Sequence, residues 1–177
     1  MDNKERTQRI EDLSVAARLR DLAVHMQEGE ASRMLKIYAV LERLEPGVYL
    51  VGAGPYTQGV YSLAGDEVVV GRQATALEEP LNVPVDLIVN DAVTLTPREV
   101  SRVHCALVRQ EVDGKVQFHL VERGSSCGTF HNGRKMEPTT SATGDGLSLT
   151  AQVLSDGDVI TLGPSGINNF LFIDLRK

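Results

Sequence analysis

The chain has 177 residues, of which 42% are hydrophobic and 24% charged, the composition of an ordinary soluble globular protein with room for one buried domain and an appendage. Its net charge of −6 at pH 7 argues against nucleic acid or an anionic membrane as a partner. No apolar run approaches the roughly 20 residues of a membrane-spanning helix. Because residues 1–6 are charged and lack the apolar core of a secretory signal, we expect a cytoplasmic protein.

Residues 1–46 are expected to form a helical N-terminal extension. Apolar residues recur at helical spacing from residue 4 to residue 44, Gly29 fits the C-terminal cap of a first helix, and Pro46 ends a second one. The second helix is predicted to place five apolar residues on one face: Met34, Ile37, Tyr38, Leu41 and Leu44. Such a small unit cannot hold a core of its own. Its apolar face must therefore pack on the rest of the chain, which we favour, or on a second copy through self-association of residues 1–46.

Residues 47–177 have the sequence pattern of a β domain. Short runs rich in Val, Ile, Leu and Phe are separated by Gly, Asp, Asn and Pro, which predicts a sandwich or a barrel. The dipeptide Asp113-Gly114 between two such runs indicates a hairpin. The predicted strands are Val48–Val51, Gly59–Leu63, Val68–Val70, Leu87–Val89, Cys105–Val108, Val116–Val121, Val159–Leu162 and Phe170–Leu175.

Chemistry-bearing residues in this β region fall into four ordered patterns. These are Gly71-Arg72, Ser101-Arg102-Val103-His104, the run Gly124–Gly133 (GSSCGTFHNG), and Leu154–Ile160 (LSDGDVI). Arginine offers a planar fork that matches a phosphate, and serine hydroxyls with loop N–H groups can complete a cage around it. Taken singly, each pattern has a plainer explanation: Asn132-Gly133, for example, is most often only a hairpin turn.

In this order the four patterns resemble the signature of the forkhead-associated (FHA) family. The resemblance implies a mainly β chain, with an FHA-type two-sheet antiparallel β-sandwich preceded by the N-terminal helical segment. It also implies that loops at one end of the sandwich bind phosphothreonine peptides. Two departures are the long stretch between Arg72 and Ser101 and the insertion over residues 136–153, both of which fall in expected loops.

The resemblance assigns roles residue by residue. Arg72 is expected to clamp the phosphate, Ser101 to donate its hydroxyl to a phosphate oxygen, and Arg102 and Ser126 to contact phosphate or peptide. Cys127 stands where the family usually has an asparagine that binds the peptide backbone, and a thiol is a poorer hydrogen-bonding group. The expected framework residues are Gly71, His104, Gly128, Thr129, Asn132 and Gly133.

The leading hypothesis is a phosphothreonine-peptide-binding adaptor in Ser/Thr-kinase signalling or phosphoregulated complex assembly, whose partner is a phosphothreonine protein, such as a kinase substrate. The alternative is a degenerate FHA scaffold that mediates phosphate-independent interaction or oligomerisation, which only Cys127 favours. We expect no enzyme, because the four histidines form no recognisable Ser/His/Asp or metal arrangement. Cys127 as a nucleophile with His131 is conceivable but disfavoured, and the close carboxylates of Asp156 and Asp158 flank a turn glycine, as structural residues do.

Metals and cofactors are not expected. With two cysteines, Cys105 and Cys127, the chain has neither a disulfide framework nor zinc-ligand spacing, which predicts two reduced thiols.

Thr7 raises one further hypothesis, self-recognition. It stands three residues before Ile10, and the family often selects an aliphatic residue at that distance from the phosphothreonine. A phosphorylated Thr7 would then bind the protein's own pocket. The plainer interpretation, which we favour, is that Thr7 caps or precedes the first helix.

Overall fold

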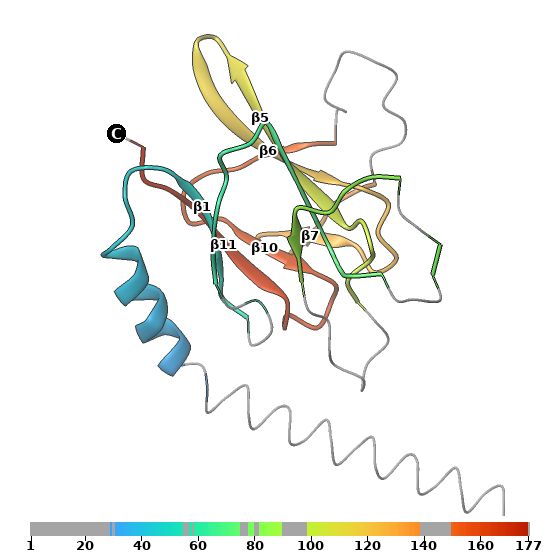
Figure 1. The fold of residues 1–177 in the computed structure, drawn as a ribbon, viewed down its shortest axis with the longest axis horizontal. Helices are drawn as coiled ribbons and strands as arrows, with labels where there is room; N and C mark the ends of the chain where they lie inside the picture. The colour runs from blue at the N-terminus through green and yellow to red at the C-terminus, as the bar shows by residue number, and fades with distance from the viewer. Residues whose placement is uncertain are drawn as a thin grey trace, which may run out of the picture.

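Two β-sheets form the body of the protein, and a helix over residues 31–41 lies beside β1 and β11 (Figure 1). The computed structural model describes residues 29, 31–54, 57, 59–74, 78–79, 82–89, 99–138 and 150–176. The strands are β1 (Val48–Gly52), β2 (Val60–Ser62), β3 (Glu67–Gly71), β4 (Leu87–Ile88), β5 (Cys105–Val112), β6 (Lys115–Glu122), β7 (Thr129–His131), β8 (Arg134–Lys135), β9 (Gln152–Val153), β10 (Val159–Leu162) and β11 (Asn169–Asp174).

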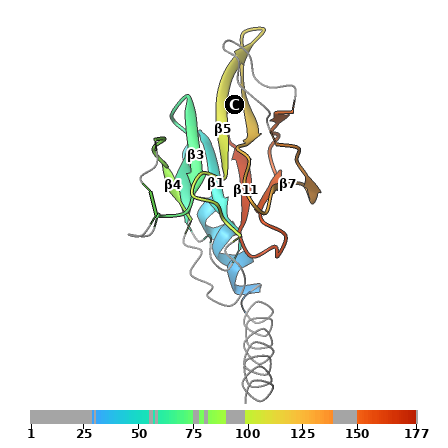
Figure 2. The same ribbon diagram turned by 90° about the vertical axis from the view of Figure 1, so that its right-hand side faces the viewer.

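One sheet has the strand order β2-β1-β11-β10-β7-β8 and the other β4-β3-β5-β6-β9, which confirms the predicted two-sheet sandwich. Figure 2 shows β3 and β4 on one side of the body and β11 and β7 on the other. The pairing is antiparallel with one exception in the described chain, because β4 runs parallel to β3. In this parallel pair Leu87 lies beside Val70 and Ile88 beside Gly71, so that β4 runs along the last two residues of β3.

The predicted Asp113-Gly114 hairpin is confirmed and joins β5 to β6. Val112 pairs with Lys115, and Asp113 and Gly114 have φ values of 51° and 74°, as a two-residue turn with the twist of the flanking strands requires. The hairpin projects beyond the body of the sandwich (Figure 1). Strands β7, β8 and β9 were not predicted; each has only two or three residues.

Side chains that alternate along the strands fill the space between the sheets. Phe118 and Phe172 meet with ring centroids 5.8 Å apart, and Tyr61 approaches Phe170 edge-on at 6.4 Å. Leu50, Val70, Leu107, Leu120, Ile160 and Leu162 belong to the same buried cluster. This core fixes the strand ends and thereby the loops that leave them.

The helix packs on the outer face of the first sheet, as favoured from the sequence. Ile37 is buried in a small cluster with Val51 and Ile173. The predicted apolar face is wrong in part, because the contact is narrow and leaves Met34 and Tyr38 40% and 59% exposed. Gly29 was expected to cap a helix but is itself helical.

No helix in the described part of the chain is long and apolar enough to span a membrane. Residues 1–28, which contain the first predicted helix and Thr7, lie outside the described residues. The division of the chain at residue 46 stays a prediction.

Candidate functional site

The first loop of the site leaves β3 at Gly71, where two segments of backbone come very close. A Cβ atom on Gly71 would lie 2.0 Å from the carbonyl oxygen of Arg102, so that no other residue fits without a shift. The backbone N–H of Arg72 donates to the carbonyl of Ser101 at 3.0 Å. Gly71 therefore lets the backbone bring Arg72 against the segment that holds Ser101 and Arg102.

His104 fixes the second loop from inside the protein. Its ring is fully buried, and its Nδ1 accepts the backbone N–H of Ser101 at 3.0 Å while its Nε2 lies 3.2 Å from the carbonyl oxygen of Gly128. An Nδ1 that accepts and an Nε2 that donates define one neutral tautomer. His104 thus connects the Ser101 loop to the loop that precedes β7.

The third loop, residues 123–128, is organised by a buried carboxylate. Glu122, at the end of β6, accepts the backbone N–H of Ser125 and the hydroxyl of Thr129. The hydroxyl of Ser125 accepts the N–H of Gly128 at 3.0 Å. Gly128 has a φ of 86°, and its carbonyl accepts the N–H of Gly163 at 3.0 Å as well as the His104 bond. The loop is therefore held at both ends and cannot shift without breaking several hydrogen bonds.

The three loops bring Arg72, Ser101, Arg102 and Ser126 together, as predicted. They line one pocket of about 420 Å³, which we call the Arg72 pocket; its other lining residues are Glu78, Val100 and Val103. The N–H of Ser126 donates to the Ser101 hydroxyl oxygen at 3.0 Å, so that the second and third loops touch directly. Cys127 follows Ser126 in the chain but is not a lining residue of the pocket.

Both arginines of the Arg72 pocket are engaged within the chain. Arg72 donates from Nη1 and Nη2 to the two carboxylate oxygens of Glu78, at 2.9 and 2.6 Å. Arg102 donates from Nη1 to the backbone carbonyl of Glu79 at 2.8 Å. The lining side chains carry two positive charges and one negative charge, so the pocket is locally positive in a chain whose net charge is −6.

The remaining framework residues lie where β7, β8 and β10 meet. Asn132 and Gly133 form the β7–β8 turn, with φ values of 49° and 78°. Asn132 donates to Asp158 at 2.8 Å and accepts the N–H of Val159 at 2.8 Å, while His131 lies 2.8 Å from the same carboxylate. Burial opposes ionisation of Asp158, but these bonds and the Ser155 N–H outweigh it and lower the pKa of the carboxyl. The Asp158 carboxylate therefore connects the β7–β8 turn to the start of β10, and His131 faces this carboxylate.

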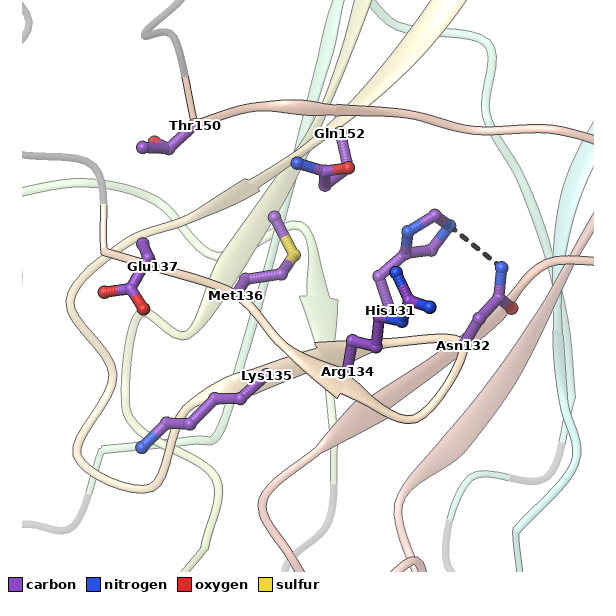
Figure 3. Close-up of a pocket in the computed structure, with 8 residues that line it drawn as sticks. All are labelled: His131, Asn132, Arg134, Lys135, Met136, Glu137, Thr150 and Gln152. Atoms are coloured by element: carbon purple, nitrogen blue, oxygen red, sulfur yellow. Dashed lines mark hydrogen bonds between the residues drawn. The ribbon is translucent and has the colours of Figure 1, made fainter.

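A larger pocket of about 730 Å³ opens beside this turn (Figure 3). It is lined by His131, Asn132, Arg134, Lys135, Met136, Glu137, Thr150 and Gln152. His131 and Asn132 point toward each other at 3.4 Å, and Asn132 is the one residue here with a role predicted from the sequence. None of these eight lining residues lines the Arg72 pocket.

Neither cysteine is in a disulfide. Burial, and after it the charge of Glu122, raises the pKa of the Cys105 thiol well above its usual range, which makes that thiol unreactive. Cys127 is partly exposed. Within the described residues no group of three or more His, Cys, Asp or Glu side chains could hold a metal ion.

Three residues that contact the site or its loops were not predicted from the sequence: Glu78, Glu79 and Glu122. Glu78 and Glu79 lie in the long stretch between Arg72 and Ser101, and only the folded chain brings them to the arginines. Glu122 could have been predicted from the sequence. A carboxylate directly after the apolar run Phe118–Val121 and before a glycine-serine loop is unusual unless its oxygens accept hydrogen bonds from that loop.

Comparison with known proteins agrees with this fold. The chain is similar to the yeast Pml1 splicing factor at 19% identity, with a TM-score of 0.56 over 84% of this chain and 92% of that one. The FHA domain of an Arabidopsis thaliana hypothetical protein is 23% identical, with a TM-score of 0.50 over 75% of this chain and 88% of that one. At these identities the similarity shows the fold; among curated proteins no match was found. The sequence model of the FHA domain matches residues 68–163, more than half of the chain, and the protein therefore belongs to the FHA domain family.

Proposed function

We propose that the protein binds phosphothreonine-containing segments of partner proteins in the Arg72 pocket. In this proposal it is a non-catalytic adaptor, working in Ser/Thr-kinase signalling or in the assembly of phosphoregulated complexes. The observation that carries the proposal is the convergence of Arg72, Ser101, Arg102 and Ser126, from three separate loops, on one pocket. Two guanidinium groups and two hydroxyls suit a phosphate dianion better than a neutral ligand.

The hydrogen bonds around Ser101 favour its role as a donor. Its hydroxyl oxygen already accepts the N–H of Ser126 at 3.0 Å, whereas among the residues that the structure describes the acceptor for its own hydrogen is the Ser126 hydroxyl, 3.5 Å away. A phosphate oxygen would be a far better acceptor for that hydrogen. Because His104 and Glu122 hold the loops before any ligand arrives, little ordering entropy is lost on binding.

Titration with a degenerate phosphothreonine nonapeptide library and its unphosphorylated twin tests the proposal. We expect the wild-type protein to bind the phosphorylated library selectively, and Arg72→Ala to lose about 2–5 kcal/mol of binding free energy. Ser101→Ala should lose about 1.5–3 kcal/mol, as for a hydrogen bond to a charged group.

Arg109→Ala is the matched control, because Arg109 also pairs with one carboxylate, that of Asp66, but does not line the pocket. Thermal unfolding of each variant checks that the fold is intact. If Arg72→Ala binds the phosphorylated library as tightly as wild type, the phosphate-independent scaffold becomes the better explanation.

A further inference from the structure

The short acidic segment Glu78-Glu79 lies across the Arg72 pocket. The Glu78 carboxylate lines the pocket and forms a two-bond fork with the Arg72 guanidinium, and the Glu79 carbonyl accepts a bond from Arg102. The segment thus engages both cations to which the proposed function assigns the phosphate.

The Arg72–Glu78 pair is stronger than a surface ion pair. The Arg72 and Glu78 side chains are only 14% and 26% exposed, so solvent screens them incompletely. Fork geometry with two parallel N–H···O bonds is also the arrangement with which arginine binds a phosphate. A phosphate that takes this edge of the guanidinium must therefore displace the carboxylate.

We propose that Glu78 is a built-in competitor that makes the Arg72 pocket select phosphate over carboxylate. This inference rests on the proposed function. A glutamate or aspartate of a passing peptide offers Arg72 nothing that Glu78 does not already offer, and Glu78 is tethered at an effective concentration near millimolar. A phosphate dianion brings a second charge and a third oxygen, which Ser101 and Arg102 can bind. Unphosphorylated acidic segments are therefore rejected.

The size of the effect follows from the fraction of molecules in which Arg72 is released. An apparent dissociation constant equals the intrinsic one divided by the competent fraction. If Glu78 occupies Arg72 in about nine molecules of ten, removal of its charge strengthens phosphopeptide binding about tenfold. The same removal opens the pocket to peptides in which glutamate replaces the phosphothreonine.

The test compares Glu78→Gln with Glu79→Gln, which have the same net charge. Glu79 contacts Arg102 through its backbone carbonyl, which glutamine retains. Wild type and both variants are titrated with the phosphothreonine library, its unphosphorylated twin and a library with glutamate in place of phosphothreonine. We expect Glu78→Gln to gain about tenfold for the phosphorylated library and to acquire binding to the glutamate library, and Glu79→Gln to match wild type within twofold. Glu78→Ala provides a second variant should the glutamine amide rebind Arg72.

Failure of this inference and failure of the proposed function are distinguishable. If wild type binds the phosphorylated library but neither Glu78 variant gains affinity or accepts glutamate, the competitor role is refuted and the proposed function stands. Weaker phosphopeptide binding by both variants would show that Glu78 positions Arg72, which also refutes competition. If no form of the protein prefers the phosphorylated library, both proposals are wrong.

Discussion

Replacement of His104 tests whether one buried ring holds the binding loops. In His104→Ala the backbone N–H of Ser101 loses the one partner that the described structure gives it, and because this group is only part-buried the cost is at the lower end of the about 1–3 kcal/mol for a buried donor. The carbonyl of Gly128 still accepts from Gly163, so its loss is smaller. With the cavity left by the ring, the free energy of unfolding should fall by about 3–5 kcal/mol.

Two further replacements separate the two ring nitrogens. Asparagine can place an oxygen near the Nδ1 position and accept from Ser101, whereas glutamine can place an amide nitrogen near Nε2 and donate to Gly128. Because Gly128 has a second donor, whereas the described residues offer the Ser101 N–H no second acceptor, His104→Asn should be more stable than His104→Gln, by about 1 kcal/mol.

Urea unfolding of the three variants measures these differences, and phosphopeptide titration reports the effect on Ser101. Affinity should fall in the order wild type, asparagine, glutamine, alanine. Equal stability of all three variants, or a glutamine variant more stable than the asparagine one, would refute the proposed hydrogen-bond roles.

Three other positions test the framework and the site. Gly71→Ala should lower the free energy of unfolding by about 1–3 kcal/mol, because its Cβ would lie 2.0 Å from the Arg102 carbonyl; unchanged denaturant unfolding would contradict this. The pKa of Asp158 is lowered in the fold, so its stabilisation is complete above the unfolded value of 3.8 and is lost as pH falls through the folded value. The stability gap between wild type and Asp158→Asn should therefore narrow in urea titrations from pH 6 towards pH 3, and a constant gap would exclude this contribution. Cys127→Asn should strengthen phosphopeptide binding by about 0.5–1.5 kcal/mol by restoring one hydrogen bond, and weaker binding by calorimetry would mean that the thiol has its own role.

The parts of the fold that were predicted correctly are those in which burial dictates the residue type. The apolar run Val68–Val70 predicted a strand, and it forms the centre of β3 with Val69 and Val70 buried. The polar pair Arg134–Lys135 gives no such signal, because both side chains of β8 are exposed and the strand exists only through its pairing with β7. The parallel β3–β4 pair depends on the path of a long connection, which local sequence does not encode.

The residues of the candidate site likewise include some that the sequence could predict and others that it could not. Arg72, Ser101 and Ser126 could be chosen because motifs in fixed order carry them, and the structure brings them to one pocket. The pairing of Glu78 with Arg72 could not be predicted, since glutamates are common in loops and only tertiary structure decides which of them meets an arginine. In the helix, apolar spacing predicted a buried face correctly at Ile37 and wrongly at Tyr38, because the sheet offers a narrower contact than the spacing allows.

The carbonyl oxygen of Gly128 has a consequence for protein engineering. It receives hydrogen bonds from His104, which precedes β5 in one sheet, and from Gly163, which follows β10 in the other. The Ser101 loop and the loop over residues 123–128 are therefore held together by hydrogen bonds from both sheets, in addition to their connections to their own strands. A transplant of the Ser101 loop alone onto another sandwich would lose these hydrogen bonds. A graft that keeps the pocket must carry His104, Gly128 and Gly163 as one unit.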